Sequence, residues 1–213
     1  MGVRVLTCFM LLSFVAWPVI IDQIAIVIEN RIVKDSDIKR EIRVTSFLNN
    51  ETPDLSPPSE KKAANRLVDQ VFIRREIEVG DYPAATLQQA DQQLEKLKKE
   101  RFRTEAAFEQ ALRRYDLTPL DLRMQFQWQL TVLRFIDVRF KPAVLITDDE
   151  IEKYYRDYAA ALRREHPSKS SLDDLRAEIR ETLTNEKVDQ QFFAWLDDQR
   201  KGTKVQFLEA SLK

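Results

Sequence analysis

A short apolar stretch near the start of the chain limits how the rest can fold. Residues Ile24–Ile28 are apolar, and they are followed by a polar turn at Glu29–Arg31 and a short apolar return at Ile32–Val33. Ser36 and Asp37 then supply residue types that begin helices. The sequence therefore predicts a β-hairpin that leads directly into a helix.

This hairpin needs further cover, because an isolated two-stranded hairpin is only marginally stable. Ile24, Ile26 and Ile28 recur at every second position, and Val205 and Phe207 repeat the pattern near the other end of the chain. We therefore expect a third strand from the C-terminal region to pair with the hairpin, which would join the two ends of the chain.

Composition favours helices for the remainder. The 213 residues include only 3 glycines, whereas good helix formers such as Ala, Leu, Glu, Arg, Lys and Gln are frequent. The apolar fraction of 44% is sufficient for a hydrophobic core. We predict a mainly α fold with a small β element, built as a single module from residues 22–213.

Capping residues and prolines mark where the predicted helices begin and end. Thr147 and Glu150 form a capping-box pattern, and Pro119 occupies a first helical position, where its missing N–H has no cost. The segment 49–59 contains three prolines and is predicted to be a loop. The predicted helices cover residues 36–48, 60–79, 86–100, a segment from 104, 118–140, a segment from 147, and 172–200, which Gly202 caps.

Residues 1–21 differ from the rest. Arg4 precedes an apolar run over residues 5–21, which is typical of an export signal or of an uncleaved membrane anchor. A cytosolic protein with a buried first strand is the alternative. With Arg4 on the cytoplasmic side, the body of the chain would lie outside the inner membrane. Cys8 is the only cysteine, so a disulfide framework is not possible.

Several segments resemble, in order, those of SurA-type periplasmic chaperones and the related parvulin-type foldases. They are the hairpin with Ser36–Ile38, the segments Leu67–Ile73, Leu117–Leu122 and Ile146–Tyr155, and the final helix and strand over 172–208. The resemblance implies a helical module that binds unfolded polypeptide clients, in particular exported proteins bound for the outer membrane, without ATP.

One part of that family is missing from this sequence. Its relatives carry parvulin isomerase domains between the last two helices, where this chain has only residues 163–171. A folded domain needs at least about 50 residues. His166, the only histidine, is interpreted as an ordinary loop residue. We therefore expect no isomerase activity and, more generally, no enzyme.

Other chemistry has little support in the sequence. The 34 Lys and Arg residues balance 35 Asp and Glu residues, which argues against a nucleic-acid partner. One histidine and one cysteine cannot form a metal-ligand cluster. The acidic groups at Asp148–Glu150 and Asp173–Asp174 lie at predicted helix starts, where carboxylates are favourable. We expect no cofactor and no metal.

The predicted helix 118–140 has apolar residues on two sides. We expect the side with Leu122, Phe126, Leu130, Leu133 and Phe140 to face the core, and the other side to line a client groove, although a fully buried helix is the alternative. The last helix either passes from one core to another, or its second half faces a client or partner. The candidate client-binding residues are Leu120, Met124, Trp128, Val132, Phe135, Phe192 and Trp195.

The functional hypothesis is a periplasmic, ATP-independent chaperone that holds unfolded exported proteins in an apolar helical groove. One alternative is a membrane-tethered, non-catalytic scaffold that binds a single fixed partner. A weaker alternative, suggested by family association only, is a foldase related to peptidyl-prolyl isomerases.

Overall fold

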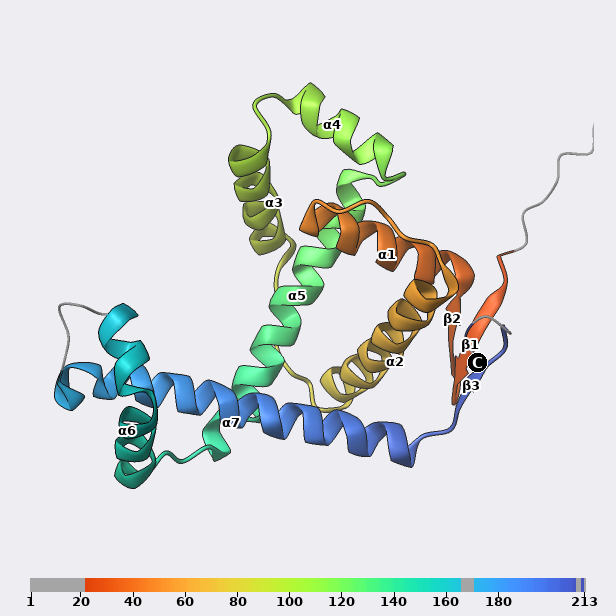
Figure 1. Ribbon diagram of the computed structural model, residues 1–213. Helices are drawn as coiled ribbons and strands as arrows, with labels where there is room; N and C mark the ends of the chain where they lie inside the picture. The colour runs from red at the N-terminus through yellow and green to blue at the C-terminus, as the bar shows by residue number, and fades with distance from the viewer. Residues whose placement is uncertain (1–21, 166–170, 210–211, 213) are drawn as a thin grey trace, which may run out of the picture.

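A computed structural model describes residues 22–165, 171–209 and 212 of this chain. The fold is mainly α with one small antiparallel sheet, as predicted (Figure 1). The export segment expected at residues 1–21 and the loop residue His166 lie outside the described residues. The elements are β1 (Ile24–Ile28), β2 (Arg31–Lys34), α1 (Asp35–Asn49), α2 (Pro57–Val79), α3 (Leu87–Arg101), α4 (Glu105–Arg114), α5 (Pro119–Arg139), η1 (Lys141–Ala143), α6 (Asp148–Glu165), α7 (Leu172–Gly202) and β3 (Val205–Phe207).

The two ends of the described chain meet in the sheet, which confirms the predicted pairing. The strand order is β2-β1-β3, and both pairs are antiparallel. Ile26 lies opposite Phe207, and Ile28 lies opposite Val205. Ile26 and Ile28 are buried, so the third strand completes the cover that a hairpin alone would lack.

The start of α1 is fixed by residues on both sides of the hairpin. The Ser36 hydroxyl donates to Oδ2 of Asp22 at 2.6 Å, and the Lys34 N–H donates to Oδ2 of Asp37 at 3.1 Å. The Ser36 hydrogen bond lowers the pKa of the Asp22 carboxyl below its usual range. The helix begins at Asp35, one residue before the predicted start.

The prediction for the start of α2 was wrong. Pro57 and Pro58 were assigned to a loop, but they form the first turn of the helix. A proline is tolerated there because the first N–H groups of a helix have no intrahelical partner. Asp54 organises the entry by accepting from the Ser56 N–H at 2.9 Å and from the hydroxyl of Ser59.

Among the described residues, three apolar clusters form the interior. The first joins the sheet to α1, α2, the C-terminal half of α5 and the C-terminal half of α7. The second joins the end of α1 to α3, α4 and the start of α5. The third is small and lies between α6 and the first half of α7. In Figure 1, the long helices α5 and α7 run from one of these regions to another and so connect them.

The prediction of which side of α5 faces the core is only partly correct. Leu122 is fully buried and Phe126 packs against the second cluster, but Leu133 is 60% exposed. The reason is that α5 passes from the second cluster to the first, so a single straight stripe cannot stay inward along its whole length. Gly202 also differs from prediction, because it is the last residue of α7 and not its cap.

Candidate functional site

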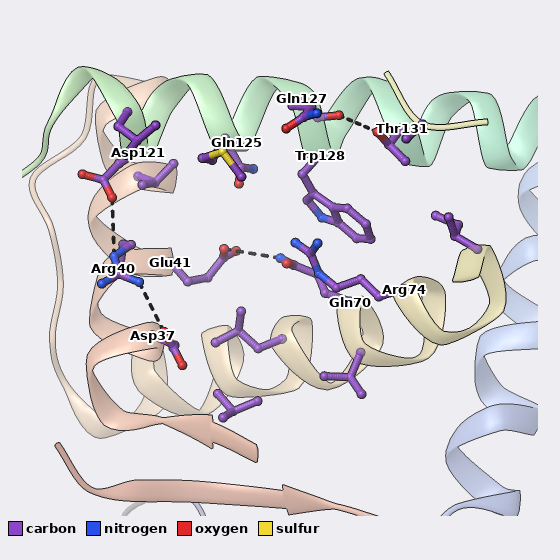
Figure 2. A pocket seen from close by; sticks show the side chains of 18 of the residues that line it. Asp37, Arg40, Glu41, Gln70, Arg74, Asp121, Gln125, Gln127, Trp128 and Thr131 are labelled. Carbon is purple, nitrogen blue, oxygen red and sulfur yellow. Dashed lines mark hydrogen bonds and ion pairs between the residues drawn. The ribbon is translucent and has the colours of Figure 1, made fainter. Parts of the chain in front are cut away.

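A pocket of about 620 Å³ lies between α1, α2 and α5 (Figure 2). In Figure 2, α5 forms one wall, α2 lies opposite it and α1 closes one end. The lining mixes apolar and charged side chains. The lining residues on α5 are Leu120, Asp121, Met124, Gln125, Gln127, Trp128 and Thr131, and those on α2 are Leu67, Gln70, Val71, Arg74, Ile77 and Glu78.

The α5 wall carries exposed apolar side chains. Leu120 is 59% exposed and Met124 is 51% exposed, one turn apart on the same side of the helix. Trp128 follows one turn later and is half-buried. Large apolar side chains beside a hollow form a surface suited to apolar ligands.

The start of α5 is fixed by a capping box. The Thr118 hydroxyl donates to the Asp121 carboxylate at 2.6 Å, and the Asp121 N–H donates back to that hydroxyl at 3.3 Å. Pro119 occupies the first turn, which favours the helical backbone. The local sequence therefore fixes the start of α5, and Leu120 lies in its first turn at the pocket.

Farther along, the rotation of α5 is set by the segment before α3. The Ala85 N–H donates to the Thr131 hydroxyl at 3.0 Å, and the Gln127 side-chain amide donates to the Ala85 carbonyl at 3.0 Å. Thr131 in turn donates to the Gln127 carbonyl at 2.8 Å. These bonds turn Trp128, which lies between the two polar residues, toward α2 (Figure 2).

The carboxylates at the α1 end of the pocket are paired. Glu41 accepts from Arg66 Nε at 3.0 Å and from the Gln70 amide at 3.4 Å. Arg40 lies between two carboxylates, 3.2 Å from Asp37 and 3.5 Å from Asp121. This end is therefore a closed ion-pair network that links the start of α1 to the start of α5.

Arg74 is arranged differently. Its guanidinium lies over the Trp128 ring, with Cζ 3.9 Å from the ring centroid. Within the part of the chain that the structure describes, no carboxylate lies within ion-pair distance of Arg74, and it makes no hydrogen bond. Partial burial of the guanidinium lowers the pKa of Arg74, and the nearby charge of Glu78 opposes that shift. The residue as a whole is exposed, and an arginine side chain keeps its charge in proteins.

The structure separates the residues predicted to bind clients. Leu120, Met124 and Trp128 come together along the pocket. Val132 and Trp195 are partly buried and pack against the first cluster, as Trp128 also does, but they do not line the pocket. The other two do not line a groove in this conformation, because Phe135 is 0% exposed and Phe192 is 8% exposed.

Sequence reasoning missed the opposite wall of the pocket. Leu67, Val71, Arg74 and Glu78 follow one another at helical spacing on α2, so two charged residues continue an apolar stripe. The available signal was an arginine, Arg74, at the position that follows the apolar residues of that stripe.

The described residues hold no group of three or more His, Cys, Asp or Glu side chains placed to bind a metal ion. Within the same residues, no helix combines the length and the apolar character needed to cross a membrane. Comparison with family models and with curated proteins finds no match to this chain.

Proposed function

We propose that this protein is a non-catalytic, ATP-independent chaperone that holds extended segments of unfolded polypeptide in the pocket between α1, α2 and α5. The observation that carries the proposal is the exposed pair Leu120 and Met124, which extends the Trp128 wall to the protein surface. Apolar residues left in water beside a hollow favour an apolar ligand, since covering them releases the water around them.

The dimensions of the pocket fit an extended chain better than a folded partner. The α5 wall from Leu120 to Thr131 rises about 16 Å at 1.5 Å per residue. An extended peptide of about five residues covers that length. A volume of about 620 Å³ is typical of a pocket for a small ligand and accepts a few side chains at a time.

The chemistry of the lining favours weak and varied binding. Met124 is flexible and polarisable, so it can repack around different side chains. Gln70, Gln125 and Gln127 can exchange hydrogen bonds with a backbone that has no secondary structure of its own. The proposal includes location outside the inner membrane and clients bound for the outer membrane, which rest on residues 1–21 and on the family resemblance.

Aggregation of an unfolded β-rich client tests the proposal. The protein should suppress light scattering without ATP, and the double variant Leu120→Ser, Met124→Ser should lose most of that effect. Phe193→Ser is the matched control, because Phe193 is 63% exposed but lies on α7, outside the pocket. Equal loss of activity in the control, or no loss in the double variant, would contradict the proposal.

The non-catalytic part has its own test. In a proline-peptide assay, the protein should not accelerate cis–trans isomerisation above the spontaneous rate. Measurable acceleration would instead favour a foldase. Tight binding of one peptide sequence, with no effect on unrelated clients, would favour a scaffold with a fixed partner.

A further inference from the structure

The charged side chains around the pocket differ in whether they have an ion-pair partner. Glu78 is paired with Arg31, and Glu41 is paired with Arg66. Asp37 and Asp121 share Arg40. Every carboxylate that lines the pocket therefore lies within ion-pair distance of an arginine. Arg74, in contrast, has no carboxylate within that distance among the described residues, and Glu78 acts on it only from farther away.

The way Arg74 is held leaves its donors available. A guanidinium that stacks on an aromatic ring uses its flat face, while its N–H groups point outward in the plane. Trp128 therefore positions Arg74 without satisfying its hydrogen bonds. A planar fork of this kind matches a carboxylate, which can accept two parallel hydrogen bonds from it.

The position of Arg74 indicates where that carboxylate would lie in a client. Leu67 and Val71 line the pocket on one side of Arg74 along α2, and Ile77 lines it on the other. The acidic group is thus flanked by apolar contacts on both sides. An acidic side chain within a segment fits this arrangement better than a chain terminus, since the lining continues past Arg74 in both directions.

We propose that the pocket selects extended segments in which an Asp or Glu is flanked by apolar residues, with the acidic side chain bound by the Trp128-stacked guanidinium of Arg74. This inference rests on the proposed function, because it names the class of segment that the same pocket accepts. Binding by Arg74 would make the pocket select segments by charge as well as by apolar character.

Matched peptides test the inference on the full chain. The probes are ten-residue fluorescent peptides with a central Leu-X-Phe, where X is Glu, Gln or Lys, all acetylated and amidated. A fourth probe ends in Leu-Gln-Phe with a free carboxylate. Because Arg74 is solvent-accessible, we expect the Glu probe to bind about fivefold more tightly than the Gln probe at low salt, the upper range for an exposed ion pair.

Variants assign that preference to one residue. Arg74→Gln should bind the Glu and Gln probes equally, and Arg74→Glu should prefer the Lys probe. Arg156→Gln is the control, since Arg156 is an exposed arginine on α6, outside the pocket, and it should keep the wild-type preference. Raising the salt concentration should reduce the preference for Glu, because it screens exposed charges.

Each other outcome overturns the inference. Equal binding of the Glu, Gln and Lys probes would remove selection by charge but leave the proposed function intact. If only the probe with a free C-terminal carboxylate bound more tightly, the site would be one for chain ends. If the preference for Glu survived Arg74→Gln, a cation other than Arg74 would be responsible for it. Binding of no probe would overturn the inference together with the proposed function.

Discussion

Helices α5 and α7 both carry apolar residues on two sides, but the molecule uses them differently. In α7, Leu175 and Ile179 pack against α6, and Val188 and Phe192 then pack into the first cluster. In α5, Leu122 packs into the second cluster and the C-terminal half packs into the first, yet Leu120 and Met124 remain exposed.

The difference lies in the neighbours of each helix. Each half of α7 has a packing partner, so its two apolar sides are used one after the other along its length. The first half of α5 packs against α3 and α4 on one side, whereas its other side faces the pocket. A second apolar side therefore indicates a binding surface only where the neighbouring elements leave a space.

The largest expected effect comes from removing the strand that follows α7. Deleting residues 203–213 removes β3 and the buried Leu212 together, so we expect a loss of about 5 kcal/mol or more, above most single core truncations. Chemical denaturation measures the loss. Gln206→Ala, an exposed position on β3, is the control and should change stability by less than about 0.5 kcal/mol.

Core truncation on both helices comes next. Phe135→Ala on α5 and Phe192→Ala on α7 should each cost about 3–5 kcal/mol, because both rings are buried among other aromatic rings. Client affinity of the folded fraction should stay unchanged. If Phe192→Ala weakened client binding and left stability intact, the contrast between the two helices would fail.

A smaller stability effect is expected at Trp128. The side chain is half-buried and packs against Arg74, so Trp128→Ala should cost less than about 2 kcal/mol, below the cost at a fully buried site. Client affinity should fall about tenfold, as at a central aromatic contact. Denaturation and peptide titration on the same sample separate the two effects, and a stability loss of several kcal/mol with unchanged affinity would place Trp128 in the core.

The smallest effect concerns the contact between α6 and α7. Glu150 lies 2.7 Å from Lys187 Nζ, and this hydrogen bond, followed by one from the Thr147 N–H, lowers the pKa of Glu150 below its ordinary 4.5. Stability from a lowered carboxyl pKa is present above the unfolded-state value and is lost as pH falls through the folded-state value. The melting temperature should therefore fall below about pH 4.5, and less steeply in Glu150→Gln. Identical slopes for the two proteins would rule out this contribution.

The order of elements could be predicted because most boundaries are marked by local chemistry. Thr147 makes the predicted capping contact at the start of α6, and Thr86, Thr118 and Ser171 make contacts of the same kind before α3, α5 and α7. The pairing of β1 with β3 could also be predicted, since a two-stranded hairpin leaves apolar residues without cover. The helix starts depend on residues close together in sequence, and the strand pairing depends on apolar hairpin residues that must be buried.

What could not be predicted depends on contacts between distant segments. The exposure of Leu133 follows from the passage of α5 between two clusters, which no single helix pattern contains. The pairing of Arg74 with Trp128 joins positions 54 residues apart on two helices. The pocket itself arises from the relative placement of α1, α2 and α5, so sequence reasoning identified one wall and missed the other.

The meeting of the chain ends in one sheet has a consequence for synthesis. Ile26 and its partner Phe207 are separated by about 180 positions, a non-local contact that forms late and slowly. A chain delivered with its N-terminus first keeps one edge of β1 unpaired until nearly all the rest has emerged. During that interval the open edge of β1 is a site where strands of other chains can pair, so the newly made chain is more open to aggregation than the folded protein.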